Sequence, residues 1–369
     1  MRTYKNIMNK LQSKSIVVDS FYTSLGAVKK KKIKPEHLKM NEREIFMKYS
    51  KMIENYHQPQ HVPKVIIDGS KKKRRTVVSP SLDEIVAQRI LCKPIEAHVK
   101  RCIHENIYGS IPGRGQHDVK RKVERWVQKG SKNTRYCLRI DIRKFFDSID
   151  TKILKRLIKR KFKDNAYKRS LFNIIDFQER GLPLGFYTSH WLAHFYLLDF
   201  DEFILQDVKP KYYIRYVDDI LIFHHKKKRL HEIRARIVKY LENKLGLKIK
   251  KNYQVFEVSY LDIDGKEKGR AIDFIGYKFH YNRTTMRKSI LKKLRGKSNK
   301  IYRDGLNVYV ARQLASYLGW ISHSDTFDYY VRYVQKTASM KMVRNYISKY
   351  DKKQSKKRRE AKKKAKKCM

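Results

Sequence analysis

The stretch 212-YYIRYVDDILIF-223 places two adjacent aspartates, Asp218 and Asp219, inside a run of aromatic and β-branched residues. Such residues on both sides predict two strands, with the aspartates in the turn between them. Aspartate is common in turns because its side chain hydrogen-bonds its own backbone. Carboxylate oxygens are also the ligands that Mg²⁺ prefers. This stretch alone therefore leaves both a plain turn and a metal site open.

A third carboxylate in a second predicted strand favours the metal site. The segment 136-YCLRIDIRKFFDSID-150 begins with alternating apolar residues and places Asp141 where the strand should end. An ordinary strand-end role for Asp141 is the alternative. Acids carried on two strands are what a two-metal phosphoryl-transfer site requires. The two segments together predict such a site more strongly than either does alone.

The composition indicates a polyanionic partner. The chain of 369 residues has 88 Lys and Arg against 36 Asp and Glu, a formal net charge of +52, so its surface must be positive unless a polyanion covers it. Nucleic acid is the first candidate, and an anionic membrane is a competing polyanion. A lysine-biased genome would also account for the abundant lysines. With 41% hydrophobic and 12% aromatic residues, the chain can bury a core and is not a disordered polycation.

The sequence shows no sign of secretion or membrane insertion. The cysteines Cys92, Cys102, Cys137 and Cys368 lack the paired spacing of a zinc site or a disulfide framework, which favours a reducing compartment. The N-terminus has no apolar region of signal-peptide length, and no run reaches membrane-span length. We therefore expect a soluble, cytoplasmic protein with no membrane partner.

Periodicity and turn residues divide the chain into helices and strands. Apolar spacing predicts helices over 41–56, 81–103, 151–162 and 229–247, two strands within 62–80 and one strand over 272–279. Ser81 and Glu84 form the expected capping box of the second helix. The lysine-rich run 352–367 is expected to be disordered, since like charges repel one another.

The motifs resemble those of the reverse transcriptases, from about residue 62 to 325. Residues 216–219, Tyr-Val-Asp-Asp, match the Y-x-D-D box of that family, and Asp141 matches its first palm motif. The resemblance implies an α+β right-hand polymerase with fingers, a palm whose antiparallel sheet is backed by helices, and a helical thumb. The expected domains are a basic helical N-terminal extension (1–60), fingers (61–135), a palm (136–284, with a finger-linked helical segment at about 151–184), a helical thumb (285–348) and a basic disordered tail (349–369).

The same resemblance implies the catalytic residues. Asp141, Asp218 and Asp219 would be catalytic, with the backbone carbonyl of Ile142 joining them as ligands of two Mg²⁺ ions, for which Mn²⁺ could substitute. Phe146, five residues after the first aspartate, would pack under the sugar of the incoming nucleotide and exclude a 2′-hydroxyl, which implies deoxynucleotide (dNTP) substrates.

Basic residues complete the implied nucleotide site. Arg75 falls at the triphosphate-binding arginine of the family, and Lys73 is the accompanying lysine taken from a cluster of five basic residues. Lys250 or Lys251 is a candidate proton donor to pyrophosphate. Template RNA and the RNA/cDNA hybrid, read by shape, are expected to contact a further set of residues. These are Tyr216, Arg114, Lys292, Lys293 and Arg295.

One motif departs from the general family pattern. Where members have Q-G-x-x-x-S-P, this chain has 184-LGFYTSH-190, so Gly185 and Ser189 match, Leu184 replaces the glutamine and His190 the proline. An aliphatic residue at 184 removes a polar contact that helps base discrimination. With this aliphatic residue, the motif is similar to that of the reverse transcriptases of diversity-generating retroelements, which copy a template RNA with errors at adenines.

That similarity implies a bacterial or phage-encoded enzyme with a structured cognate RNA and a small basic oligomeric accessory protein. A retron-like or antiphage-defence reverse transcriptase that copies its own noncoding RNA is the alternative. A catalytically idle, RNA-binding protein of the same fold is a third reading, which the three aspartates argue against.

Overall fold

The computed structural model describes residues 3–28, 32–54, 56, 64–68 and 73–367, and the side chains of 67, 68, 73, 75 and 357–367 lie outside this description. The chain forms two compact units. The first comprises Met1–Arg114, Leu138–Ile222 and Lys228–Val255, and the second Gly115–Cys137, Phe223–Lys227 and Phe256–Met369. Within the described residues, no helix has the length and apolar character needed to cross a membrane.

A five-stranded sheet carries both predicted aspartate motifs. Its strand order is β3-β5-β6-β4-β7. The short edge strand β3 pairs in parallel with β5, an addition to the expected antiparallel palm, whereas β5 and β6 are joined by a two-residue turn and are therefore antiparallel. The strands are β3 (Ile107–Tyr108), β4 (Tyr136–Asp141), β5 (Tyr212–Tyr216), β6 (Asp219–His224) and β7 (Gln254–Glu257).

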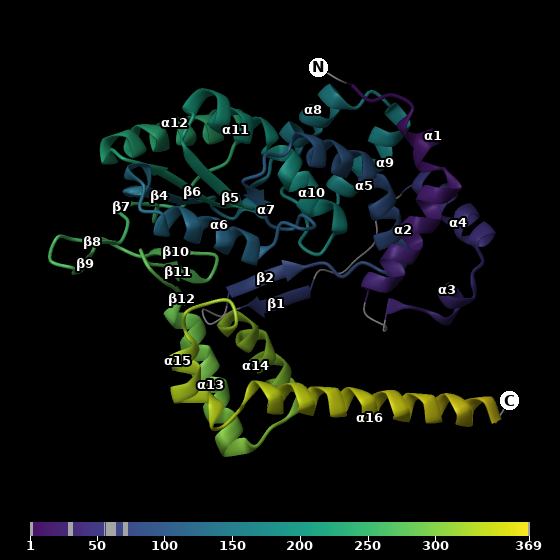
Figure 1. The fold of residues 1–369 in the computed structure, drawn as a ribbon. Helices are drawn as coiled ribbons and strands as arrows, with labels where there is room; N and C mark the ends of the chain where they lie inside the picture. The colour runs from purple at the N-terminus through teal and green to yellow at the C-terminus, as the bar shows by residue number, and fades with distance from the viewer. Residues whose placement is uncertain (1–2, 29–31, 55, 57–63, 69–72, 368–369) are drawn as a thin grey trace. The chain divides into compact units, whose positions relative to one another are not determined.

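Helices cover this sheet. Figure 1 shows α11 (Leu198–Phe203) and α12 (Lys227–Leu245) over one face, and the apolar stripe of α12 is buried. A π-helical turn, η3 (Ile204–Val208), follows α11. Further helices of the first unit are α7 (Phe145–Ser148), α8 (Thr151–Lys161), α9 (Asn165–Ile175) and α10 (Tyr187–Tyr196).

The N-terminal helices pack around α5 (Leu82–Cys102), the long helix predicted from its capping box. The Glu84 amide donates to the Ser81 hydroxyl, and the Glu84 carboxylate accepts from the Ser81 amide, as expected. Helices α2, α4, α9 and α10 contact α5. The four helices before it are α1 (Ile7–Leu11), α2 (Lys14–Ala27), α3 (Pro35–Lys39) and α4 (Glu42–Glu54).

A basic hairpin follows, with β1 (Lys64–Asp68) antiparallel to β2 (Lys73–Val77), as the sequence predicted for 62–80. The loop at 69–72 lies outside the described residues. Beyond β2, the Val78 amide donates to the Leu184 carbonyl at 2.8 Å. This bond joins the base of the hairpin to the loop that carries the 184–190 motif.

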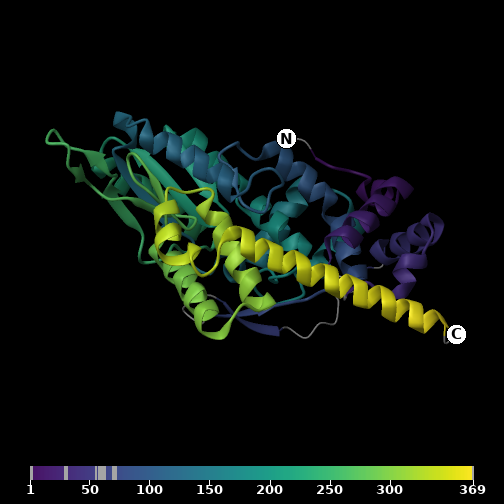
Figure 2. The same ribbon diagram turned by 60° about the horizontal axis from the view of Figure 1, so that its bottom comes forward.

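The second unit has a helical core. Its buried apolar residues come from α13 (Lys288–Asp304), α14 (Val308–Ile321), α15 (Phe327–Tyr330), η4 (Val331–Gln335) and the start of α16 (Met340–Lys367), which Figure 2 shows as one long C-terminal helix. The unit also contains α6 (Gln116–Gln128), η2 (Lys132–Thr134), β8 (Tyr260–Leu261), β9 (Glu267–Lys268), β10 (Ile272–Phe274), β11 (Tyr277–Phe279) and β12 (Thr284–Met286).

Two sequence predictions differ from the structure. The segment 272–279 is a tight hairpin instead of one strand, because Ile275 and Gly276 both adopt positive φ, 45° and 89°, between β10 and β11. The run 352–367, in the tail 349–369 predicted to be disordered, continues helix α16 to Lys367. Lys, Arg, Ala and Glu all have high helix propensity, and no Gly or Pro interrupts them there.

Candidate active site

The turn between β5 and β6, next to the paired aspartates, contains a residue in a strained conformation. Val217 adopts a φ of 54°, a rare conformation for a β-branched residue. Its amide donates to the Tyr108 carbonyl at 3.0 Å. The next residue, Gly109, has a φ of 90°, and a Cβ there would lie 2.6 Å from Val217 Cγ2. Glycine at 109 therefore lets the neighbouring loop pack directly against the turn.

A buried ion pair holds the same turn through its backbone. The Arg215 side chain is fully buried, and its Nε donates to Asp201 Oδ1 at 2.8 Å while a second guanidinium nitrogen donates to Oδ2. Its third nitrogen donates to the Val217 carbonyl at 2.8 Å. The Tyr213 hydroxyl also donates to Asp201, at 2.6 Å. A rigid, paired guanidinium thus holds the backbone oxygen next to Asp218.

The turn places Asp218 beside Asp141 at the end of β4. The Ile142 amide donates to the Asp218 carbonyl at 3.1 Å, and both carboxylates line a cavity of about 480 Å³. Lys250 pairs with Asp141 through Nζ and Oδ2 at 2.5 Å, and its own amide donates to the Asp141 carbonyl. The structure therefore brings Asp141 and Asp218 to the same cavity.

Burial and mutual repulsion shape the electrostatics of this cavity. Burial, followed by the negative charges of Asp141 and Asp219, raises the pKa of Asp218 to about 6. Burial also raises the pKa of Asp219, an effect that the nearby Arg139 guanidinium, 3.6 Å from its Oδ1, opposes. Carboxylates this close together are stabilised when a cation shares them.

The residues present fit a divalent cation held by two carboxylates. Asp141 Oδ1 is buried and has no hydrogen-bond partner among the described residues, so one ligand atom is available. Asp218 lines the same cavity. Asp219 is not among its lining residues, and in the described part of the chain no three His, Cys, Asp or Glu side chains are grouped as a metal site. A three-carboxylate arrangement is therefore not formed here.

Two of the nucleotide-side residues predicted from the sequence lie at the cavity. Phe146 and Leu184 both line it. Gly185 has a φ of 105°, and a Cβ at that position would lie 2.0 Å from the Val78 carbonyl oxygen, so only glycine allows β2 to approach the 184–190 loop. The backbone of Ile142 lies beside that of Asp218, to whose carbonyl its amide donates.

Basic residues of the hairpin reach the cavity. Lys73 and Arg75 lie on β2, and their side chains are outside the described residues. Arg74 and Thr76, on the same strand, line the cavity together with Arg143 and Lys144. The sequence offered five adjacent basic residues and no signal to decide which of them faces the cavity.

The residues predicted to contact nucleic acid are divided between the two units. Tyr216 is partly buried at the end of β5. Arg114 donates to the carbonyls of His104 at 2.7 Å and Ile107 at 3.4 Å, and so ties its own loop together. Lys292, Lys293 and Arg295 lie on α13 of the second unit, with the Arg295 guanidinium 4.5 Å from the ring centroid of Tyr333.

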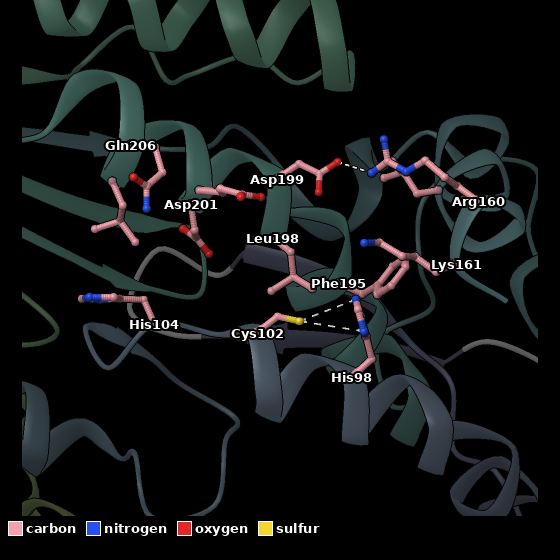
Figure 3. Close-up of a pocket in the computed structure, with 13 residues that line it drawn as sticks. His98, Cys102, His104, Arg160, Lys161, Phe195, Leu198, Asp199, Asp201 and Gln206 are labelled. Carbon is pink, nitrogen blue, oxygen red and sulfur yellow. Dashed lines mark hydrogen bonds and ion pairs between the residues drawn. The ribbon is translucent and has the colours of Figure 1, made fainter. Parts of the chain in front are cut away.

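Sequence reasoning missed the residues that position the site. Asp201 and Arg215 sit in segments that the sequence marks only as apolar helix and strand. Asp201 also borders a second cavity, of about 470 Å³. Figure 3 shows Arg160 paired with Asp199 there and the Cys102 sulfur facing the His98 ring. None of the described side chains predicted to belong to the site lines this cavity.

Comparison with protein families identifies the class of protein. The family model described as reverse transcriptase (RNA-dependent DNA polymerase) matches residues 62–279, more than half of the chain. The match includes the β1–β2 hairpin, the 184–190 loop and both aspartate motifs. This chain belongs to the reverse transcriptase family and has the fold of that family.

Individual relatives are distant. Protein YkfC of Escherichia coli (strain K12) is 23% identical over 164 residues, which cover 42% of this chain and 43% of YkfC. Apo telomerase from Candida tropicalis matches with 12% identity and a TM-score of 0.46, over 77% of this chain and 60% of that one. Telomerase from Candida albicans, in complex with the TWJ fragment of telomeric RNA, matches with 12% identity and a TM-score of 0.45, over 78% and 57%.

The raised pKa of Asp218 predicts a pH-dependent cost of keeping this carboxylate ionised. Because its folded-state pKa, about 6, exceeds its ordinary value of 3.8, the folded state binds the proton more tightly, and stability falls as pH rises from about 4 to above 6. In the presence of a metal chelator, the free energy of unfolding of Asp218→Asn should exceed that of wild type by about 1–2 kcal/mol at pH 7, but not at pH 4.

Denaturant unfolding of both proteins between pH 4 and pH 8 measures this difference. Asp264→Asn, a change at an exposed turn aspartate, is the matched control and should follow wild type at every pH. A stability difference between Asp218→Asn and wild type that does not vary with pH would contradict the assigned electrostatics.

Proposed function

We propose that this protein is an RNA-directed DNA polymerase that copies a structured cognate RNA into cDNA from dNTPs. The observation that carries the proposal is the cavity in which two carboxylates, Asp141 at the end of β4 and Asp218 in the β5–β6 turn, meet the aromatic ring of Phe146 and the basic residue Arg74. Membership of the reverse transcriptase family supports it. We further propose fingers at 61–135, a palm at 136–284 and a thumb at 285–348.

The proposed cofactor is a pair of Mg²⁺ ions, with Mn²⁺ as a substitute. When bound, the ions would supply Lewis-acid activation of the primer 3′-hydroxyl and neutralisation of the triphosphate. Asp141 and Asp218 would hold them with the Ile142 carbonyl, and Asp219, paired with Arg139, would take a peripheral part. Lys250, within 2.5 Å of Asp141, is placed to balance negative charge and to donate a proton to departing pyrophosphate.

The remaining cavity residues would bind and orient the nucleotide. Arg74 and Arg143 offer planar guanidinium groups suited to phosphate oxygens, and Lys144 offers a point charge. Lys73 and Arg75 on the same strand keep their proposed role at the triphosphate. Phe146 would lie under the sugar and reject a 2′-hydroxyl by contact. Preorganised cations of this kind stabilise charge that develops during phosphoryl transfer.

Leu184 supports the finer proposal of an error-prone enzyme from a diversity-generating retroelement. It lines the cavity with Asp218 and Phe146, where an aliphatic side chain offers no hydrogen bond to nucleotide or template. Discrimination between bases would then depend on pairing alone. A small basic oligomeric accessory protein is proposed as partner on the same ground, and a defence or retron-like role is the alternative.

Primer extension tests the polymerase proposal. On a primed RNA template with Mg²⁺ and dNTPs, wild type should extend the primer, and Asp218→Asn should extend it at least about 100-fold more slowly, because loss of residues that only support metal ligands already costs 10- to 100-fold. Asp264→Asn serves as the control and should match wild type. Equal extension by Asp218→Asn and wild type would refute the assigned site.

Exchanging Leu184 tests the subgroup proposal. Leu184→Gln should lower the error frequency at template adenines, since it restores a polar contact near the nascent pair, while Leu184→Met keeps the side chain aliphatic and should leave the frequency unchanged. Sequencing of cDNA made by the three proteins measures the outcome. Error spectra that are identical for Gln, Met and wild type would count against a diversity-generating enzyme.

A further inference from the structure

Helix α10 brings a histidine against the aromatic wall of the cavity. The rings of His190 and Phe146 meet edge to face, with centroids 5.4 Å apart and planes at 81°. Phe146 lines the cavity with Asp141 and Asp218, whereas His190 is not among the lining residues. His190 therefore contacts Phe146 from outside the space that a nucleotide would occupy.

The backbone of Phe146 is held independently of its ring. Its carbonyl accepts a hydrogen bond from the Leu182 amide at 2.8 Å, and Gly181 packs so closely that a Cβ would lie 2.6 Å from that oxygen. With the backbone fixed, the orientation of the ring depends on its aromatic neighbours. Among the described residues these are His190 and Phe145, whose ring centroid is 5.5 Å from that of Phe146.

The histidine is not explained by packing alone. Its Nδ1 is buried without a hydrogen-bond partner among the described residues, which is unfavourable for folding. Burial lowers the pKa of His190, so the ring is neutral at neutral pH. An aliphatic residue of similar volume would fill the space without an unpaired nitrogen. What it would lack is the aromatic contact with Phe146.

We propose that His190 is a positioning residue that holds the Phe146 ring in place and thereby sets how strongly the site rejects nucleotides with a 2′-hydroxyl. The inference rests on the proposed polymerase function and deepens it. The Phe146 ring can exclude a 2′-hydroxyl by contact only if the ring cannot move away. A small displacement of a positioning group changes rates substantially. An aromatic neighbour meeting the ring edge to face resists such a displacement.

Sugar selectivity is the direct readout. The ratio of kcat/KM for a dNTP to that for the matching ribonucleotide is measured by single-nucleotide extension on one primed RNA template. His190→Leu should lower this ratio roughly 2- to 12-fold, the range to which the interaction free energy of an aromatic pair corresponds. His190→Phe keeps a ring and should stay within about twofold of wild type. His231→Leu, the same change at an exposed position on α12, is the matched control.

A double variant separates positioning from general damage. If His190 acts through Phe146, His190→Leu should have no further effect on the ratio in a Phe146→Ala background. His190→Gln, which also removes the ring, serves if His190→Leu folds poorly by circular dichroism.

Three outcomes overturn parts of the account in distinguishable ways. An unchanged ratio in both ring-removing variants, or an equal loss with and without Phe146, refutes the inference alone. Failure of wild type to incorporate any dNTP refutes the polymerase proposal, and with it the role of His190 in sugar selection.

Discussion

The candidate site depends on one buried interaction, the pairing of Arg215 with Asp201. Both side chains are withdrawn from water, Arg215 completely, and an unpaired charge at such a depth would be strongly unfavourable. Each guanidinium nitrogen has an acceptor, two on Asp201 and the third at the Val217 carbonyl, and Tyr213 also donates to the carboxylate. The charge pair therefore fixes a backbone atom one residue before Asp218.

The hydrogen bond to the Val217 carbonyl helps to hold the whole turn. Val217 can remain at its unfavourable φ because hydrogen bonds from Arg215 and to Tyr108 hold both its carbonyl and its amide. The turn then directs Asp218 toward Asp141 in a cavity where burial raises the pKa of Asp218. Strain of this kind persists only where the surroundings determine the conformation. Here it produces two adjacent carboxylates poised for a cation.

Part of the fold and of the candidate site could be predicted from local residue patterns in the sequence. The residues around Asp218 and Asp219 predict a hairpin, and the strand ending at Asp141 follows from its alternation. Capping residues located α5, and the motif at 184–190 located the loop beside the cavity. Each of these signals lies within a few neighbouring residues, where propensity and periodicity act.

The remainder depends on contacts between distant segments. Nothing near Arg215 indicates that a helix would supply Asp201 as its partner, since a lone arginine in a strand is usually exposed. The five adjacent basic residues gave no signal that Arg74 would line the cavity, because that depends on which face of β2 meets it. The pairing of His190 with Phe146 likewise requires α10 to dock beside α7, which no local pattern encodes.

The central claim is that the Arg215–Asp201 pair holds the turn so that Asp218 and Asp141 can bind a divalent cation together. Titration with Mn²⁺, with the free ion followed by electron paramagnetic resonance, tests it most directly on wild type and on Arg215→Met with its fold verified by circular dichroism. The account predicts a saturable Mn²⁺ site in wild type and an affinity at least about 10-fold weaker in the folded variant, as for loss of a residue that orients metal ligands. Equal Mn²⁺ affinity in the two proteins would contradict it.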